Sequence, residues 1–188
     1  PFLITQIEDY KSLKNHPDSY IAENTRLIIG PWKHADQVNL PNGESVAYRE
    51  NSVWPAIPWF DEILGKGTKK IVDVNIFVMG INHWREEQEW PLARAQESKY
   101  YLHSGGKANS TNGDGSLGTD GPQAEPPDVF LYNPADPVPT TGGALCCNPY
   151  YAANGAYDQN EVEERQDVLV YSTPPLERDV EVTGPVTV

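Results

Sequence analysis

Residues 26–34 have the sequence RLIIGPWKH. A short apolar run ends here at Gly30 and Pro31, which is typical of a strand buried on both faces in a parallel sheet. Active sites of open α/β sheets form at the carboxyl ends of the strands. His34 lies on the loop that follows this strand, and an imidazole titrating near pH ~6.5 can take a serine's proton and return it to a leaving group. His34 is therefore our candidate general base.

Helical patterns flank this strand. Residues 1–15 carry apolar side chains roughly on one face, and residues 53–64, VWPAIPWFDEIL, repeat them at helical spacing before two nearby glycines. The stretch between, residues 32–51, is rich in Asn, Pro and Gly, and we expect it to be a loop. We therefore expect residues 1–67 to form the C-terminal part of an α/β domain.

The pattern changes to β after residue 67. Short strand-like runs alternate with long polar, turn-rich connections, and few helical patterns remain. This favours an antiparallel β-sandwich over residues 68–188, most consistent with a jelly roll. The last run stops in mid-pattern, so we expect the sandwich to be incomplete and the chain to be an internal part of a longer polypeptide. The predicted strands are 70–80, 98–104, 128–133, 167–173 and 179–188.

Composition excludes several classes of partner. The formal net charge of −13 without a basic patch argues against nucleic acid, and no apolar run reaches the roughly 20 residues of a membrane helix. The two cysteines, Cys146 and Cys147, are adjacent and cannot form a disulfide framework, which favours a reducing compartment such as the cytoplasm. His83 and His103 lack a third ligand at suitable spacing, so we predict neither a metal site nor a cofactor.

Six segments, in order along nearly the whole chain, resemble motifs of one family, the cocaine esterase and X-Pro dipeptidyl-peptidase family of serine hydrolases. The segments are GPWKH (30–34), FVMGINHWREEQEWP (77–91), KYYLHSGGKAN (99–109), YNPADPVPTTGG (132–143), YDQNEVEERQDVLVYST (157–173) and EVTGPV (181–186).

The resemblance implies an α/β-hydrolase domain with a helical cap, followed by a jelly roll of the galactose-binding-like type. It also implies cleavage of esters or amides by a Ser-His-Asp triad through an acyl-enzyme, without a cofactor. His34 matches the triad histidine, and Trp32, packed beside it, is a candidate substrate-binding residue. A G-x-S-x-G nucleophile elbow is absent from the sequence. We expect the serine, the oxyanion hole and the aspartate upstream of Pro1, with Asp9 as the in-chain alternative for the acid, so this chain alone should be inactive.

The resemblance also assigns a role to the segment after Gly143. In the family, a loop of the jelly roll lies against the active site and presents bulky apolar side chains to the substrate. Leu145, Cys146 and Cys147 occupy those places here, and we predict that they line the substrate pocket. The alternative is that the two cysteines are small buried residues at a sandwich edge. Neither is expected to be a nucleophile, since no base is near them in the sequence.

A stand-alone β-sandwich that binds carbohydrate or a protein partner is the rival function, because fold alone does not settle function. The segment RLIIGPWKH is evidence against this rival function, because a binding module has no reason to carry it. Within the hydrolase class, X-Pro dipeptidyl-peptidase and α-amino acid ester hydrolase both remain open. The expected partners are a small ester or amide substrate and the rest of the parent polypeptide; self-association into a homo-oligomer is left open.

One further motif lies in the polar stretch 109–121. Asn109, Ser110 and Thr111 fit a glycosylation sequon, which has meaning only in a protein secreted by a eukaryote. The same stretch has alternating oxygen ligands like a calcium loop but lacks the distal Glu, so we predict a hairpin connection.

Overall fold

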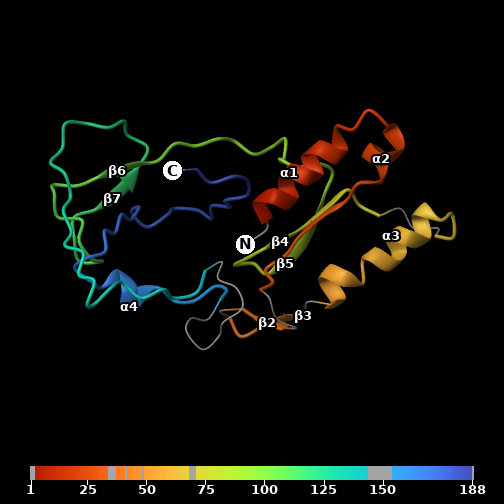
Figure 1. Cartoon of the computed structure of the whole chain (residues 1–188). Coiled ribbons are helices and arrows are strands. Elements are labelled where there is room, and N and C mark those ends of the chain that lie inside the picture. The colour runs from red at the N-terminus through yellow and green to blue at the C-terminus, as the bar shows by residue number, and fades with distance from the viewer. Residues whose placement is uncertain are drawn as a thin grey trace. The chain divides into compact units, whose positions relative to one another are not determined.

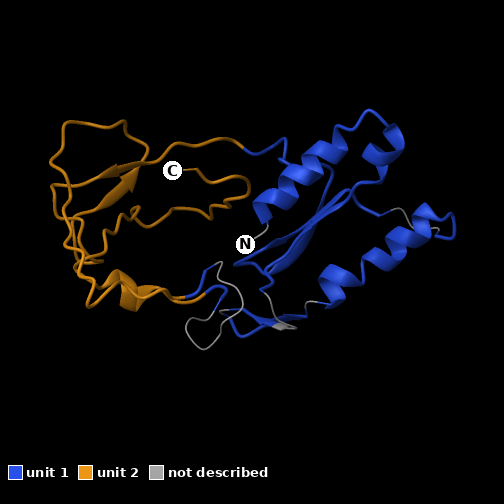
Figure 2. Ribbon diagram, in the orientation of Figure 1, with its two compact units in different colours: residues 1–95, 142–156, 188 blue, residues 96–141, 157–187 orange. Residues whose placement is uncertain are grey.

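The computed structural model describes residues 3–33, 37–40, 42–47, 49–67, 71–143 and 154–187. The chain divides into two compact units, shown in different colours in Figure 2. Unit 1 comprises residues 1–95, 142–156 and 188, and unit 2 comprises residues 96–141 and 157–187. The domain boundary that we predicted after residue 67 stays a prediction.

Unit 1 contains most of the regular elements (Figure 1). In chain order they are α1 (Leu3–Lys14), α2 (Ser19–Asn24), β1 (Leu27–Ile29), β2 (Gln37–Asn39), β3 (Ser45–Ala47), a π-helical turn (Arg49–Val53), α3 (Ala56–Ile63), β4 (Val74–Val78) and β5 (His83–Glu87). Unit 2 contains β6 (Tyr101–His103), β7 (Ser116–Gly118) and α4 (Asn160–Glu163).

The main sheet of unit 1 has the order β1-β4-β5. β1 pairs in parallel with β4, with Leu27 opposite Val74 and Ile29 opposite Ile76, and β4 pairs antiparallel with β5. The parallel pairing that RLIIGPWKH predicted is therefore confirmed. A parallel pair needs a long crossover, and here residues 30–73 supply it with the β2–β3 hairpin and α3.

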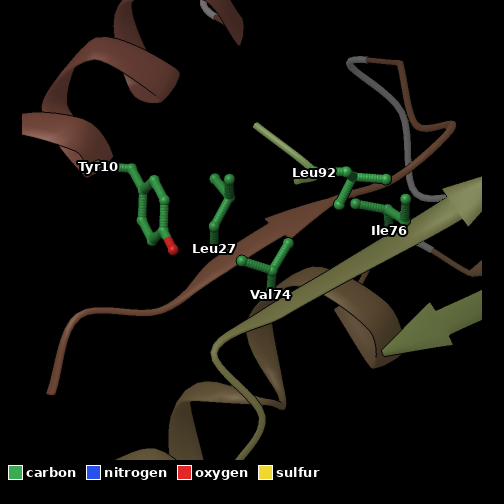
Figure 3. Close-up of a cluster of buried hydrophobic side chains, with 5 residues drawn as sticks. All are labelled: Tyr10, Leu27, Val74, Ile76 and Leu92. Atoms are coloured by element: carbon green, nitrogen blue, oxygen red, sulfur yellow. The ribbon is translucent and has the colours of Figure 1, made fainter. Parts of the chain in front are cut away.

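Alternation along β4 gives this sheet two apolar faces. On one face a first cluster is formed by Tyr10 of α1 with Leu27, Val74, Ile76 and Leu92, drawn in Figure 3. On the other face Phe77 packs against a second cluster made of Val38, Leu40 and Val46. Covering both faces is what a parallel pair of strands requires.

Polar contacts fix the entry into β1. Asp18 caps α2 by accepting a hydrogen bond from the Tyr20 backbone N–H at 2.9 Å. Asp73, just before β4, forms ion pairs with Lys14 of α1 at 3.2 Å and with Arg26 at 3.4 Å. These two ion pairs hold α1 and the start of β1 to the same end of β4.

The hairpin of β2 and β3 lies in the stretch that we expected to be a loop, so that expectation was wrong. Val38, Leu40 and Val46 are buried at 5–9% exposure. Asn42 accepts a hydrogen bond from the Glu44 backbone N–H, and Gly43 takes a φ of 88°, which a residue with a side chain rarely adopts. Asn-Gly between alternating apolar residues is a strong hairpin signal, and it was present in the sequence.

The helix predicted over residues 53–64 is confirmed as α3, Ala56–Ile63. The chain before it forms the π-helical turn, in which the Trp54 N–H bonds the Arg49 carbonyl at 2.9 Å. Trp59 is half-buried and donates its indole N–H to the Asn24 carbonyl at 2.8 Å. The apolar stripe of Ile57, Phe60 and Leu64 is exposed, at 54–62%.

Unit 2 has less regular structure than the sequence predicted. β6 and β7 form a two-stranded antiparallel sheet, but 128–133, 167–173 and 179–187 contain no strand, so those predictions were wrong. The second of these makes only isolated bridges, Asn109 to Leu169 and Ser116 to Ser172. A β-prone run becomes a strand only when its backbone finds a continuous partner. These runs find none in the described part of the chain, and the jelly roll stays a prediction.

Side chains that bond backbone groups hold unit 2 together. Asn109 donates both amide hydrogens, to the Val129 carbonyl at 3.0 Å and to the Gln166 carbonyl at 2.9 Å. Ser110 is buried at 1% exposure with a positive φ of 63°, and its hydroxyl accepts a hydrogen bond from Gln166 at 3.2 Å. Within the described ranges, no helix is both long and apolar enough to cross a membrane.

Candidate functional site

The loop that leaves β1 is shaped by a close approach between Gly30 and Trp32. A β-carbon added at Gly30 would overlap the six-membered ring of the Trp32 indole. Glycine is thus the residue that lets the indole lie against the chain directly after the strand. Since His34 comes two residues after Trp32, this approach fixes the chain immediately before the candidate base.

Trp32 belongs to a group that we name the aromatic cluster: Trp32, Phe77 and Trp84. The ring centroids of Trp32 and Trp84 are 5.6 Å apart at an angle of 38°. Trp84 meets Phe77 edge to face at 5.3 Å, because the two residues are direct cross-strand partners in β4 and β5. Trp32 and Phe77 also pack against the second cluster. Tilted and edge-to-face ring contacts at these distances are favourable.

A second feature approaches the same loop within unit 1. Gly143 and Gly155 exchange two backbone hydrogen bonds, of 2.7 and 3.0 Å, and both have positive φ, 84° and 109°. A β-carbon at Gly155 would lie 3.5 Å from Cδ of Lys33, at ordinary van der Waals contact. Gly155 therefore lies beside Lys33, the residue that precedes His34 in the sequence.

Most of the predicted site residues lie outside the described part of the chain. These are His34, Leu145, Cys146 and Cys147. Trp32 is described and half-buried, while its predicted place beside His34 stays a prediction. Asp9, the in-chain alternative for the triad acid, is exposed in the second turn of α1.

Sequence reasoning missed a polar centre in unit 2. The Asp128 carboxylate accepts hydrogen bonds from the Ser104 hydroxyl (2.6 Å), the Tyr171 hydroxyl (2.6 Å) and the Ala108 N–H (2.8 Å). The bonds from Ser104 and Tyr171 lower the pKa of Asp128, and the bond to Asp128 raises the pKa of Tyr171 to about 12. These shifts follow from bonding to the charged form of the carboxylate and to the protonated form of the phenol. The centre is structural, and the sequence carried no spacing that would have revealed it.

Nearby charged groups of unit 2 are paired with each other. His103 lies 2.7 Å from Glu125 through Nδ1 and 3.1 Å from the Asp120 carbonyl through Nε2. Arg165 binds Asp167 at 2.7 Å and Asp136 at 3.4 Å, and these residues line a hollow of about 350 Å³. Among the residues that the structure describes, no group of three or more His, Cys, Asp or Glu side chains could hold a metal ion.

Known proteins share both parts of this chain. Residues 67–188 match the model of the X-Pro dipeptidyl-peptidase C-terminal non-catalytic domain. The chain is 34% identical over 194 residues to a protein described as cocaine esterase from Rhodococcus sp. (strain MB1 Bresler), an alignment that covers 99% of this chain and 32% of that protein. The crystal structure of an aminopeptidase from the marine sediment archaeon Thaumarchaeota archaeon matches 81% of this chain and 25% of its own, with a TM-score of 0.52 and 25% identity.

The extent of these matches shows which part of the family this chain represents. It spans about a third of the length of the curated relative, whose alignment includes the candidate histidine loop as well as the C-terminal domain. The matched family domain begins at Gly67, the second of the two glycines that follow α3. The chain therefore belongs to the cocaine esterase and X-Pro dipeptidyl-peptidase family, of which it carries the C-terminal non-catalytic domain and the segment that precedes it.

Proposed function

We propose that this chain is part of a serine hydrolase that cleaves carboxylic esters or amides, with His34 as its general base. The observation that carries the proposal is the 34% identity to a cocaine esterase over 99% of the chain, since it includes the segment RLIIGPWKH and not only the non-catalytic domain. The triad serine and aspartate and the oxyanion hole would come from residues upstream of Pro1.

The described part of the loop supports this role for His34. A general base is effective only when it is held in reach of the hydroxyl that it deprotonates. β1 belongs to a sheet with both faces covered, and the contacts of Trp32 with Gly30 and Trp84 hold the chain at residues 30–32. The histidine therefore follows a segment that a folded core holds in one conformation.

In the proposed reaction, His34 removes the proton from the serine hydroxyl as the oxygen attacks the substrate carbonyl. The resulting imidazolium gives that proton to the leaving alcohol or amine as the bond to the carbonyl carbon breaks, which leaves an acyl-enzyme. Water then attacks the acyl carbon while His34 takes a proton from the water. The bond between the acyl carbon and the serine oxygen breaks, His34 returns the proton to that oxygen, and the carboxylic acid leaves. Each half-reaction leaves His34 neutral and needs no cofactor.

Leu145, Cys146 and Cys147 are proposed to line the acyl or leaving-group pocket. The support is that Gly155, which is hydrogen-bonded to Gly143, lies beside Lys33, and these two glycines are close in the sequence to either end of residues 144–153. Two cysteines fill less volume than large apolar side chains, so a wider pocket is expected.

A second proposal applies to residues 67–188 alone. The matched family model is described as non-catalytic, which favours a supporting or binding role for this domain, such as recognition of a carbohydrate or of a protein partner. A serine-directed probe distinguishes the two proposals. The first predicts that the longer parent polypeptide is labelled and that this chain by itself is not.

The test is the intact mass of the full-length parent before and after reaction with a fluorophosphonate. We expect one adduct on the folded parent, and we expect His34→Gln to lower both the labelling rate and kcat by at least about 10³-fold. His16→Gln is the matched control, since His16 is exposed before α2 and should leave both values unchanged. A His34→Gln parent with the kcat of the natural protein would overturn the proposal.

A further inference from the structure

The aromatic cluster joins the histidine loop to the domain that the family model describes as non-catalytic. Trp32 lies in the segment before His34, whereas Phe77 and Trp84 lie in β4 and β5, within residues 67–188. We propose that Trp84 is a positioning residue for the general base: its ring holds Trp32, and Trp32 holds the chain that leads to His34. The inference rests on the proposed function of His34.

The first argument is that the Trp32 side chain packs against several parts of the folded unit at once. Its indole lies against the backbone at Gly30, is tilted on Trp84 at 5.6 Å, and packs against the second cluster. A side chain confined by several partners cannot change rotamer without losing those contacts. The backbone of Trp32 is therefore held through its own side chain.

The second argument is that these contacts close a ring through the sheet. β1 leads into Gly30 and Trp32, Trp32 meets Trp84 of β5, β5 pairs with β4, and β4 pairs in parallel with β1. The loop is thus attached to the same sheet at two points, at the end of β1 and through Trp84. A loop attached at both ends of a short span has little freedom to shift relative to the sheet that supports it.

The third argument concerns the chemistry that depends on this segment. A displacement of about 1 Å at a reacting group can cost ~100-fold in rate. A residue that acts through another on the general base should therefore lower kcat while substrate binding, and with it KM, stays nearly constant. A residue needed only for stability would instead lower the amount of active enzyme.

The experiment uses the full-length parent enzyme, with active sites counted by fluorophosphonate adducts in the intact mass. We expect Trp84→Leu to lower kcat per active site by about 10- to 100-fold, with KM changed less than about threefold. Trp84→Phe keeps an aromatic ring against Trp32 and should restore most of kcat. The matched control is Trp59→Leu: Trp59 is also a half-buried tryptophan of unit 1 with a ring partner, Phe60 at 4.8 Å, and its loss should leave kcat per active site unchanged.

A second variant keeps the test decisive if Trp84→Leu does not fold. Gly30→Ala displaces the Trp32 ring without touching Trp84, and it should give the same loss of kcat with little change in KM. The double variant Gly30→Ala/Trp84→Leu should lose little more than either single variant, because both break one chain of contacts. Full kcat per active site in Gly30→Ala, or equal losses in Trp84→Leu and Trp59→Leu, would overturn the inference.

The two proposals fail in different ways. If His34→Gln keeps its activity, the function proposed for His34 is wrong whatever Trp84 does. If His34→Gln is inactive and the Trp84 and Gly30 variants keep full kcat, His34 remains the base and only the positioning role is lost.

Discussion

Unit 1 is packed around apolar side chains, whereas unit 2 is tied together by polar side chains that bond to the backbone and to each other. Among the described residues, every large buried apolar side chain comes from unit 1. The buried residues of unit 2 are Ala108 and Ser110.

This difference predicts which changes should lower the stability of each unit. Apolar burial does not depend on protonation, so the core of unit 1 should be sensitive to the volume of its side chains, and the pH dependence of this unit should come from its ion pairs, such as those of Asp73 and Glu87. Hydrogen bonds to carboxylates and to imidazole depend on which form is charged, so unit 2 should be sensitive to pH and to isosteric changes of a single group. The five tryptophans all lie in unit 1, so tryptophan fluorescence follows that unit alone.

The largest effect is expected from Ile76→Ala in the first cluster. Ile76 is 4% exposed in the centre of β4, and its truncation should cost about 2–5 kcal/mol of unfolding free energy through lost burial and a cavity. Urea unfolding followed by tryptophan fluorescence measures it. Ile57→Ala is the control, since Ile57 is 61% exposed on α3 and should change the value by less than about 0.5 kcal/mol. Equal effects of the two variants would contradict an apolar core in unit 1.

The next effect tests the polar centre of unit 2 with Asp128→Asn. Ser104 and Tyr171 both donate to Oδ2 of Asp128, so an amide nitrogen at that position, which donates and cannot accept, deprives both hydroxyls of their acceptor. The pKa of Tyr171, raised to about 12 by this bond, should fall toward the usual value near 10. Ultraviolet titration of tyrosinate, with Tyr171→Phe to assign the change, measures the shift. Asp179→Asn, at an exposed position, should leave it in place.

Amide hydrogen exchange sharpens the same comparison. Asp128→Asn should speed exchange at Ala108, whose N–H loses its charged acceptor, while β1 and β4 of unit 1 keep their protection. Faster exchange across unit 1 as well would mean that the two units do not differ in the way described.

A smaller effect is expected for the pair of His103 and Glu125. Their hydrogen bond raises the pKa of His103 and lowers that of Glu125. A raised histidine pKa adds stability that is complete below the unfolded pKa and is lost as pH rises through the folded value. A lowered glutamate pKa adds stability that is present above its unfolded pKa and is lost as pH falls through the folded value. The pair therefore stabilises unit 2 between the two pKa values.

His103→Gln tests this window. The variant should melt earlier than the natural chain near pH 5 to 6, and the difference should shrink at alkaline pH, where His103 is neutral, and at strongly acidic pH, where Glu125 is protonated. Thermal melting curves of the chain recorded over this range of pH provide the measurement. A difference that does not vary with pH would exclude a protonated pair.

The smallest effect is expected from Glu8→Gln on α1. Lys11 and Glu8 lie 2.8 Å apart at i,i+3 spacing, but the glutamate side chain is 65% exposed. Exposed helix pairs contribute about 0.2–0.5 kcal/mol and are screened by salt. Urea unfolding of unit 1 should barely change, and less so at high salt. A larger loss than that of Ile76→Ala would contradict the view that the apolar core stabilises unit 1 more than its exposed charge pairs do.

The sequence predicted unit 1 better than unit 2, for a physical reason. α3 has an apolar pattern at helical spacing, α1 begins and ends close to the predicted bounds, and the apolar run Leu27–Ile29 found a parallel partner in β4. The β2–β3 hairpin was not predicted, because the many Pro, Asn and Gly residues of this stretch indicated a loop. Asn42-Gly43 nevertheless marked the turn of the hairpin. In unit 2, the run 128–133 is β-prone, but pairing depends on distant partners that local patterns do not encode.

The candidate site was predictable to a different extent. The Gly-Pro turn after β1 indicated a rigid loop, and the structure shows Gly30 pressed against Trp32. The contact of Trp32 with Trp84 could not be predicted, because it joins residues 52 positions apart through a strand register that only the fold sets. The same holds for the approach of Lys33 to Gly155.

The hydrogen bonds of Asn109 have a consequence for how this protein could be produced. In the folded unit 2 both hydrogens of its amide are donated to carbonyl groups, of Val129 and Gln166, and Ser110 of the same sequon is buried. An oligosaccharide attached to that nitrogen would remove at least one of these bonds and place a bulky group between two chain segments. In the secretory pathway of a yeast or mammalian host, glycosylation of Asn109 would therefore compete with folding of unit 2. Asn109→Gln would prevent glycosylation but would not restore the natural contacts, because the glutamine amide is displaced by one methylene.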